Sequence, residues 1–264
     1  MKVVLFCGGL GTRLRDYSDA VPKPMVKIGH RPVLWHVMRY YAHYGHTEFV
    51  LCLGYKADVI KEYFLDYSEA ASNDFVLSGG GKDLRLLSSD IDDWSITFVD
   101  TGVSSNIGER LLAVKDYVDD EPFLANYADG VTDLHLPTML DEMRLQSDLT
   151  AAFMAVPPPL SLHVTDFDEG GRVSSIVPMS ASGLYVNAGF FYLTPEVFDF
   201  MVPGEELVVE PFQRMSEKSR LVAYPYHGFF RAMDTFKDKQ ALDDLYDAGP
   251  APWEVWKHER PFGD

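Results

Sequence analysis

Apolar and polar positions along the first half of the chain follow two alternating patterns. Short apolar runs predict buried strands at residues 2–7, 48–53, 95–99 and 122–125. Between them, apolar residues recur at helical spacing, which predicts helices at residues 33–44, 58–67, 109–118 and 137–146. This alternation is typical of a parallel sheet with crossover helices. We therefore expect an α/β fold with a doubly wound, mostly parallel, Rossmann-like sheet.

The pattern changes after residue 148. Strands are predicted at residues 149–156, 162–166, 173–177 and 184–193, with fewer helices between them, and a helix is predicted at residues 236–247. A length of 264 residues fits one domain with a sizeable core, so we expect a single domain over residues 1–264 with a smaller, β-rich second portion. The segments 78–82 and 90–93 are expected to leave the sheet, as surface loops, a subunit contact or a cover over a ligand.

The formal net charge of −17 limits the partners that we expect. Such a chain repels a phosphate backbone, which excludes a nucleic-acid partner. No apolar run approaches the roughly 18 residues that a membrane helix needs, and the chain begins with a strand pattern instead of a signal peptide. We therefore expect a cytoplasmic protein without membrane contact, in which Cys7 and Cys52 are buried free thiols.

A glycine loop follows the first predicted strand. It reads Gly8-Gly9-Leu10-Gly11-Thr12-Arg13-Leu14, and Pro22-Lys23-Pro24-Met25 comes shortly afterwards. The loop lacks the third glycine of the dinucleotide-binding pattern and the lysine of a P-loop. Its glycines nevertheless let backbone N–H groups approach an anion closely, and Arg13 and Lys23 add positive charge near the same point. The sequence therefore predicts a cradle for a triphosphate.

Two carboxylates are candidates for a metal site. Asp129 follows a predicted strand, at the edge of the sheet where ligands of open α/β folds bind. Asp234 comes just before the predicted helix at 236–247. Two carboxylates from distant segments suit a Mg²⁺ ion that keeps water and phosphate oxygens as its other ligands. The alternatives are a turn-forming role for Asp129 and a helix N-cap role for Asp234.

The glycine loop and the Pro-Lys-Pro-Met segment together resemble the signature of sugar-phosphate nucleotidyltransferases. Within that family the chain looks most like the glucose-1-phosphate cytidylyltransferase branch, on the segments Asn126-Tyr127-Ala128-Asp129-Gly130-Val131, Val186-Asn187-Ala188-Gly189-Phe190-Phe191 and Met233-Asp234-Thr235. The resemblance runs through nearly the whole chain. It implies a GT-A-like fold, CTP as the nucleotide, Mg²⁺ as the cofactor, a CDP-linked product with pyrophosphate, and a homo-oligomer.

The resemblance and the charge requirements of the reaction assign roles to individual residues. Most of them lie in the first half, 1–148, which we expect to bind mainly the nucleotide. Arg13 would hold the leaving pyrophosphate and Lys23 the α-phosphate, while Asp129 and Asp234 would hold Mg²⁺. The expected cradle and base-binding residues are Gly8, Gly9, Gly11, Thr12, Ser105 and Arg110. Glu109, near the expected base, could accept a hydrogen bond from an exocyclic amine or could be the first-turn acid of a helix.

The second half, 149–264, is expected to bind mainly the acceptor and departs from the family there. Family members carry Glu-Lys-Pro where this chain reads Ile176-Val177-Pro178-Met179-Ser180, so the lysine that contacts the sugar phosphate is missing. Cations that could replace it are Arg172, His163 and Arg231. The expected acceptor-binding residues are Asn187, Gly189, Glu210 and Arg231.

Three functions therefore stay open. The first is transfer to a sugar 1-phosphate. The second is a cytidylyltransferase for another acceptor, such as a cyclitol phosphate, a small phosphorylated metabolite or a phosphonate. The third is a catalytically silent nucleotide-binding module.

Overall fold

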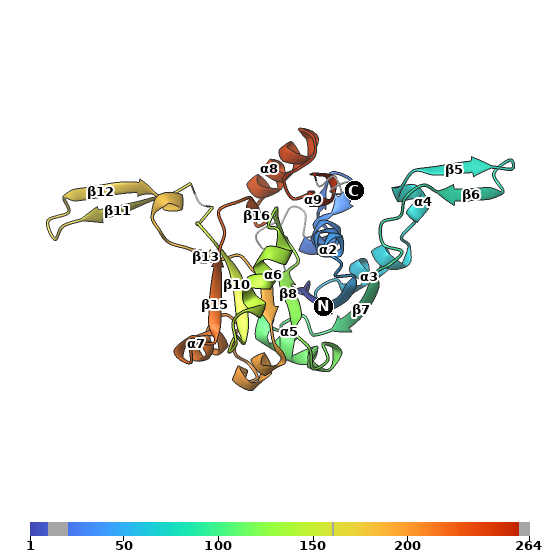
Figure 1. Cartoon of the computed structure of the whole chain (residues 1–264). Helices are drawn as coiled ribbons and strands as arrows, with labels where there is room; N and C mark the ends of the chain where they lie inside the picture. Colours follow the sequence, from blue (N-terminus) through green and yellow to red (C-terminus); the bar gives the residue numbers. More distant parts are fainter. Residues whose placement is uncertain (10–20, 160, 259–264) are drawn as a thin grey trace.

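An eight-stranded mixed sheet forms the centre of the protein in the computed structural model, which describes residues 1–9, 21–159 and 161–258 (Figure 1). Four parallel strands, in the order β7-β4-β1-β8, make one side of the sheet. They are β7 (Ser95–Asp100), β4 (Glu48–Leu53), β1 (Val3–Phe6) and β8 (Phe123–Tyr127). On the other side, β14 (Phe191–Leu193) joins β8 to β10 (Ala151–Val156), antiparallel to both. The strand β15 (Leu221–Pro225) then pairs with β10 in parallel. The predicted α/β, mostly parallel sheet is confirmed.

Alternate side chains of β1 enter two different cores, as the period of a strand requires. Val3 and Leu5 face a core covered by α2 and α6, whereas Val4 and Phe6 face a core covered by α5 and α7. The helices of the first face are α2 (Val33–His43), α3 (Ala57–Leu65), α6 (Leu136–Arg144), α8 (Phe236–Asp247) and α9 (Val255–His258). Those of the second face are α5 (Ile107–Ala113), η5 (Pro195–Phe200) and α7 (Glu210–Glu217). The sheet is therefore a middle layer between two helical layers.

The strand predicted at residues 184–193 is interrupted. It divides into β13 (Val186–Asn187) and β14, which pair with opposite ends of β10. At the break, Gly189 and Phe190 have φ angles of +80° and +50°, which a continuous strand does not allow. The helix predicted at 109–118 is also different, because α5 ends at Ala113 and a separate turn, η3 (Lys115–Tyr117), follows.

Two hairpins project from the body at opposite sides (Figure 1). The first arm is β5 (Phe75–Ser78) with β6 (Asp83–Leu86), and the glycine-rich segment 78–82 is its tip. The second arm is β11 (His163–Phe167) with β12 (Val173–Pro178). Both strands of the second arm were predicted, but they pair with each other instead of joining the central sheet.

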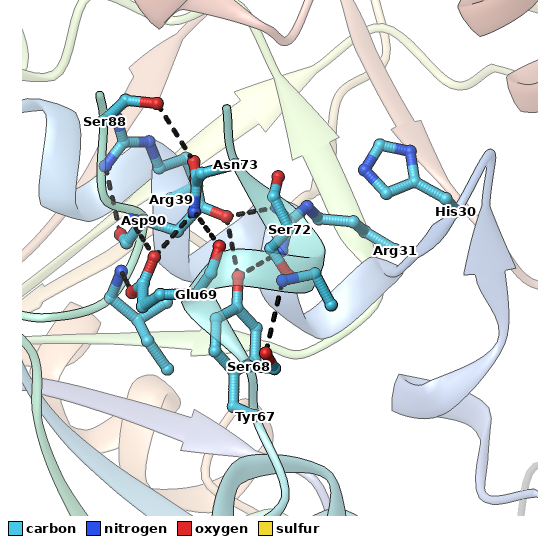
Figure 2. A network of polar contacts seen from close by, with 12 residues as sticks. His30, Arg31, Arg39, Tyr67, Ser68, Glu69, Ser72, Asn73, Ser88 and Asp90 are labelled. Atoms are coloured by element: carbon cyan, nitrogen blue, oxygen red, sulfur yellow. Dashed lines mark hydrogen bonds and ion pairs between the residues drawn. The ribbon is translucent and has the colours of Figure 1, made fainter. Parts of the chain in front are cut away.

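The first arm is anchored at its base by the polar network in Figure 2. The buried Arg31 donates hydrogen bonds to Tyr67 and Asp90. Its guanidinium lies over the ring of Trp35. Glu69, in α4 (Glu69–Ser72), accepts hydrogen bonds from the backbone N–H groups of Asp90 and Ile91, both at 2.9 Å. Because these contacts fix both chain segments at the base, they hold the arm in one direction.

The short elements that remain complete the fold. They are η2 (Lys23–Met25), η4 (Met179–Ala181), and the strand pairs β2 (Lys27–Ile28) with β3 (Arg31–Pro32) and β9 (Gly130–Thr132) with β16 (Phe230–Ala232). Cys7 and Cys52 are buried free thiols, as the sequence predicts. In the described part of the chain, no helix has the length and apolar character that crossing a membrane requires.

Candidate active site

The carboxyl ends of β1, β4 and β7 are joined by the side chain of Arg110. Its Nη1 donates to Thr101 Oγ1 at 2.7 Å and to the carbonyl of Leu53 at 3.2 Å. Its Nη2 donates to the carbonyl of Gly8 at 3.0 Å. These acceptors are neutral, and burial lowers the pKa of Arg110 from its ordinary value. Arg110 therefore fixes the start of the glycine loop and adds a positive charge to the wall behind it.

Two glycines allow this close packing. A Cβ at Gly8 would lie 1.9 Å from Arg110 Nη1, and a Cβ at Gly54 would lie 2.7 Å from the carbonyl oxygen of Gly102. Neither space admits a side chain. Gly9, by contrast, is exposed and has open space beside it. The predicted cradle residues Gly11, Thr12 and Arg13 lie outside the described residues.

Lys23, Asp129 and Asp234 meet at one point. Lys23 Nζ forms an ion pair with Asp129 Oδ2 and lies 2.7 Å from Asp234 Oδ1. Lys23 begins the η2 turn between Pro22 and Pro24, so its backbone is fixed by the neighbouring rings. Burial lowers the pKa of Lys23, but the two carboxylates outweigh burial and the pKa is raised overall. The sequence-predicted pair of carboxylates thus converges on one cationic group.

Asp234 belongs to this cluster and does not cap the helix α8 that follows it. The N-cap of α8 is Thr235, whose hydroxyl accepts from the Asp238 N–H at 3.2 Å while Asp238 accepts from the Thr235 N–H at 2.9 Å. The alternative N-cap role for Asp234 is therefore wrong. For Glu109, the helix alternative is the one observed. It forms a capping box with Asn106 at the start of α5, so it is the first-turn acid of a helix.

A cavity of about 320 Å³ opens beside Gly9, at the start of the glycine loop. Gly9, Lys23 and Asp129 lie on its wall together with Ser105 and Arg110, which were predicted to bind the nucleotide. The Ser105 hydroxyl donates to the carbonyl of Thr101 at 2.5 Å, which leaves its oxygen able to accept. We call this space the first cavity. The other residues that line it are Phe6, Cys7, Pro24, Asn106, Ile107, Tyr127, Ala128, Glu206 and Asp234.

A second cavity of about 400 Å³ lies next to the first. Tyr127, Asp129 and Asp234 line both cavities, so the two carboxylates stand at their junction. The rest of the second cavity's lining is mostly apolar and contains no lysine, arginine or histidine among the described residues. It consists of Gly130, Pro158, Pro159, Val186, Asn187, Ala188, Phe230 and Ala232.

The four predicted acceptor-binding residues are not brought together. Asn187 lines the second cavity and also accepts from the Gly189 N–H at 2.8 Å, which closes the turn after β13. Gly189 serves this turn, since a Cβ there would lie 2.3 Å from Asn126 Oδ1. Arg231 lies between the lining residues of β16 and so points to the opposite face of that strand. Glu210 is exposed at the start of α7.

The other two candidate cations do not line the second cavity either. His163 belongs to the second arm, and Arg172 lies next to its turn; both are exposed. The described part of the second cavity therefore gains no positive charge from them.

Glu206 is a lining residue that the sequence pattern does not predict. It belongs to an irregular segment before α7, about a hundred positions from the helix α5 that it contacts, so no spacing pattern connects the two. Burial, followed by the charges of Glu206 and Asp129, raises the pKa of Tyr127 to about 12. Among the described residues, the lining of the first cavity thus includes three carboxylates, of Asp129, Glu206 and Asp234, and the cationic side chains of Lys23 and Arg110.

The chain is similar to known proteins in sequence and in fold. The family model described as nucleotidyl transferase matches residues 2–223. The chain is 38% identical over 263 residues to the glucose-1-phosphate cytidylyltransferase of Salmonella typhi, covering 97% of this chain and 100% of that protein. It is 35% identical over 258 residues to the probable glucose-1-phosphate cytidylyltransferase of Bacillus subtilis (strain 168), with the same coverage of both chains. The fold is similar to that of a UDP-glucose pyrophosphorylase crystallised with UDP-glucose, with a TM-score of 0.70, 17% identity, and coverage of 94% of this chain and 98% of that one.

Proposed function

The chain belongs to the nucleotidyl transferase family, and we propose that it transfers the cytidylyl group of CTP to a sugar 1-phosphate, giving a CDP-linked sugar and pyrophosphate. The observation that carries this proposal is the position of Asp129 and Asp234, which line two adjacent cavities with Lys23 between them. We assign the first cavity to the nucleotide and the second to the acceptor. The reacting phosphates would then meet at the junction.

The reaction needs positioning and charge neutralisation more than proton transfer. An oxygen of the acceptor phosphate, already ionised at neutral pH, attacks the α-phosphorus of CTP. A new P–O bond forms there, and the bond from the α-phosphorus to the bridging oxygen of the pyrophosphate breaks. We assign the α-phosphate to Lys23, which lines the first cavity, and Arg110 adds positive charge to the wall of that cavity. We assign the leaving pyrophosphate to Arg13.

The carboxylate pair fits a Mg²⁺ ion. Asp129 and Asp234 already converge on one cation, the ammonium group of Lys23, and carboxylate oxygens are ligands that Mg²⁺ prefers. The described residues contain no group of three or more His, Cys, Asp or Glu side chains able to bind a metal, so phosphate oxygens and water would complete the coordination. When bound, Mg²⁺ would neutralise phosphate charge at the junction. Removal of the metal with EDTA should stop pyrophosphate release, and added Mg²⁺ should restore it.

The second cavity also favours a second candidate function, transfer to an acceptor other than a hexose 1-phosphate. Family members place a lysine near the sugar phosphate, whereas Pro158, Pro159 and Val186 line this wall and no cation does so among the described residues. A cyclitol phosphate, a small phosphorylated metabolite or a phosphonate is therefore the alternative acceptor. The silent-module alternative is opposed by family membership and by the convergence of Lys23, Asp129 and Asp234.

We also propose that the chain assembles with copies of itself through the first arm. Phe75, Leu77, Leu84 and Leu86 share one face of this hairpin, by the register of its strands. Leu77 and Leu84 are 57% and 50% exposed, and an isolated two-stranded hairpin is only marginally stable in water. Residues 74–89 carry two acids and two bases, so the arm is neutral in a chain of net charge −17 and can approach a second copy without strong repulsion. The cytoplasmic location stays a prediction.

Substitution of Asp129 tests the catalytic assignment. We expect Asp129→Asn to lower the kcat of pyrophosphate release about 1,000-fold. The reason is that Mg²⁺, which would neutralise phosphate charge at the junction, loses one of its carboxylate ligands. Asp120→Asn, an exposed change after η3, is the matched control and should keep wild-type turnover. Wild-type kcat in a folded Asp129→Asn protein would contradict the assignment.

A further inference from the structure

Glu206 lines the first cavity, and one of its carboxylate oxygens is buried and unpaired among the described residues. Its Oε2 accepts a hydrogen bond from the Ile107 N–H at 3.4 Å, at the start of α5. Its Oε1 has almost no exposure to solvent and receives no hydrogen bond from the described residues. Of the buried side-chain atoms left unpaired in the described chain, Glu206 Oε1 is the one whose residue lines this cavity.

The backbone around Glu206 is fixed on both sides. Gly108 lets the segment approach α5 closely, since a Cβ there would lie 2.2 Å from the carbonyl oxygen of Glu205. Asn106 Nδ2 donates to the carbonyl of Gly204 at 3.0 Å, and Arg214 forms an ion pair with Glu205. The side chain of Leu207 is fully buried. Glu206 is therefore held in position and does not depend on a mobile loop.

An unpaired buried carboxylate oxygen is costly, and native proteins retain few such atoms. The neighbouring polar side chains are engaged elsewhere. Asn106 uses its oxygen on the Glu109 N–H and its nitrogen on Gly204, and the Ser105 hydroxyl donates to Thr101. Arg110 donates to carbonyls and to Thr101 at the ends of the strands. The missing donor is therefore best supplied by a ligand in the cavity.

The chemistry of the wall limits what that ligand group can be. A phosphate would be repelled by the carboxylate. A metal ion shared with Asp129 and Asp234 does not fit, because the described acids form no group of three that could bind one. Apolar surface lies next to Glu206, from Ile107 and from the ring of Tyr127. Such a wall suits a flat base that carries an N–H donor on its edge.

We propose that Glu206 selects cytosine, by accepting a hydrogen bond from its 4-amino group. This inference rests on the proposed function, and it assigns the choice of nucleotide to a residue outside the glycine loop. Cytosine presents an amine donor at the position where uracil presents a carbonyl acceptor. The carboxylate therefore attracts CTP and repels UTP at one atom.

The test compares CTP with UTP in the wild type, Glu206→Gln and the control Glu142→Gln, an exposed change on α6. Glutamine keeps the size of the side chain but can donate to the uracil carbonyl. We expect the ratio of kcat/KM for CTP to that for UTP to fall at least about tenfold in Glu206→Gln, mainly through a higher KM for CTP. Glu142→Gln should keep the wild-type ratio.

Calorimetric binding of CTP, UTP and dCTP with Mg²⁺ provides a second readout that does not need turnover. We expect Glu206→Gln to lose preference for CTP over UTP and to keep the wild-type ratio of CTP to dCTP. An unchanged CTP to UTP ratio in both assays would overturn the inference. Equal losses of affinity for CTP and UTP, together with a changed ratio of the affinities for CTP and dCTP, would also overturn it. Such a result would place Glu206 at the ribose. If the wild type binds CTP but does not release pyrophosphate with any acceptor, the result would instead count against the proposed function.

Discussion

For single residues, the sequence predicted which charged groups come together. It did not predict every residue that reaches the same cavity from a distant segment. Lys23, Asp129 and Asp234 carry the two-part signature and the strand-end position, and the structure brings all three together. Glu206 could not be predicted, because its contact with α5 arises only when two distant segments pack. Arg110 was predicted to bind the nucleotide; it lines that cavity while holding the ends of three strands.

His36 gives a prediction about pH. Its Nδ1 accepts from Trp253 Nε1 at 3.3 Å, so its Nε2–H must donate to the carbonyl of Ile28 and the ring is neutral. Burial lowers its pKa to about 3, below the value of about 6.5 in an unfolded chain. Between these two values the unfolded chain binds the extra proton, so the free energy of unfolding falls as the pH falls.

We expect acidification from pH 7 to pH 5 to cost the wild type about 2 kcal/mol more than it costs His36→Gln. Urea unfolding of both proteins at the two pH values measures this difference. Burial also lowers the pKa of His46, to about 4. Because His46 is present in both proteins, its contribution to the pH dependence cancels in the comparison. Equal pH dependence of the two would show that His36 titrates normally.

At the scale of elements, periodicity predicted the strands and helices of the nucleotide side but not the break in the strand at 184–193. The apolar pattern continues through Gly189 and Phe190, and only their positive φ angles show the interruption. The start of α8 was also ambiguous, since Asp234 and Thr235 both suit an N-cap. The structure separates their roles, with Thr235 on the helix and Asp234 at the cavity.

This separation predicts different effects for neighbouring residues. Thr235→Ala should lower the free energy of unfolding by about 1 kcal/mol, because α8 loses its cap, and should leave kcat close to the wild-type value. Thr235→Ser keeps the capping oxygen and is the control. Urea unfolding and pyrophosphate release measure the two effects. A large fall in kcat with unchanged stability would mean that Thr235 belongs to the reaction site.

For the whole molecule, a pattern of apolar positions predicts strands but does not predict which other element packs against their apolar faces. The strands at 162–166 and 173–177 were predicted, yet they form an arm outside the sheet, and the first arm likewise exposes an apolar face. The network of Arg31, Tyr67 and Asp90 that holds the first arm joins segments far apart in the sequence (Figure 2). No local signal predicts it.

Self-association through the first arm should therefore depend on the apolar face. We expect Leu77→Asp to lower the oligomer mass in sedimentation velocity, because it puts a charge among exposed apolar residues. Ser78→Asp, on the opposite face of the same strand, should leave the mass unchanged. A wild type that sediments as a monomer at micromolar concentration would refute the proposed assembly.

Two cavities meet at Asp129 and Asp234, and we propose that CTP is joined there to a sugar 1-phosphate. The most direct test is pyrophosphate release by the wild type with Mg²⁺, across ATP, CTP, GTP, UTP and dTTP, each with glucose 1-phosphate, a cyclitol phosphate or a phosphonate. We expect release with CTP and glucose 1-phosphate, or with CTP and one of the other acceptors if the apolar second cavity has changed the acceptor specificity. No release with CTP and any of these acceptors would contradict it.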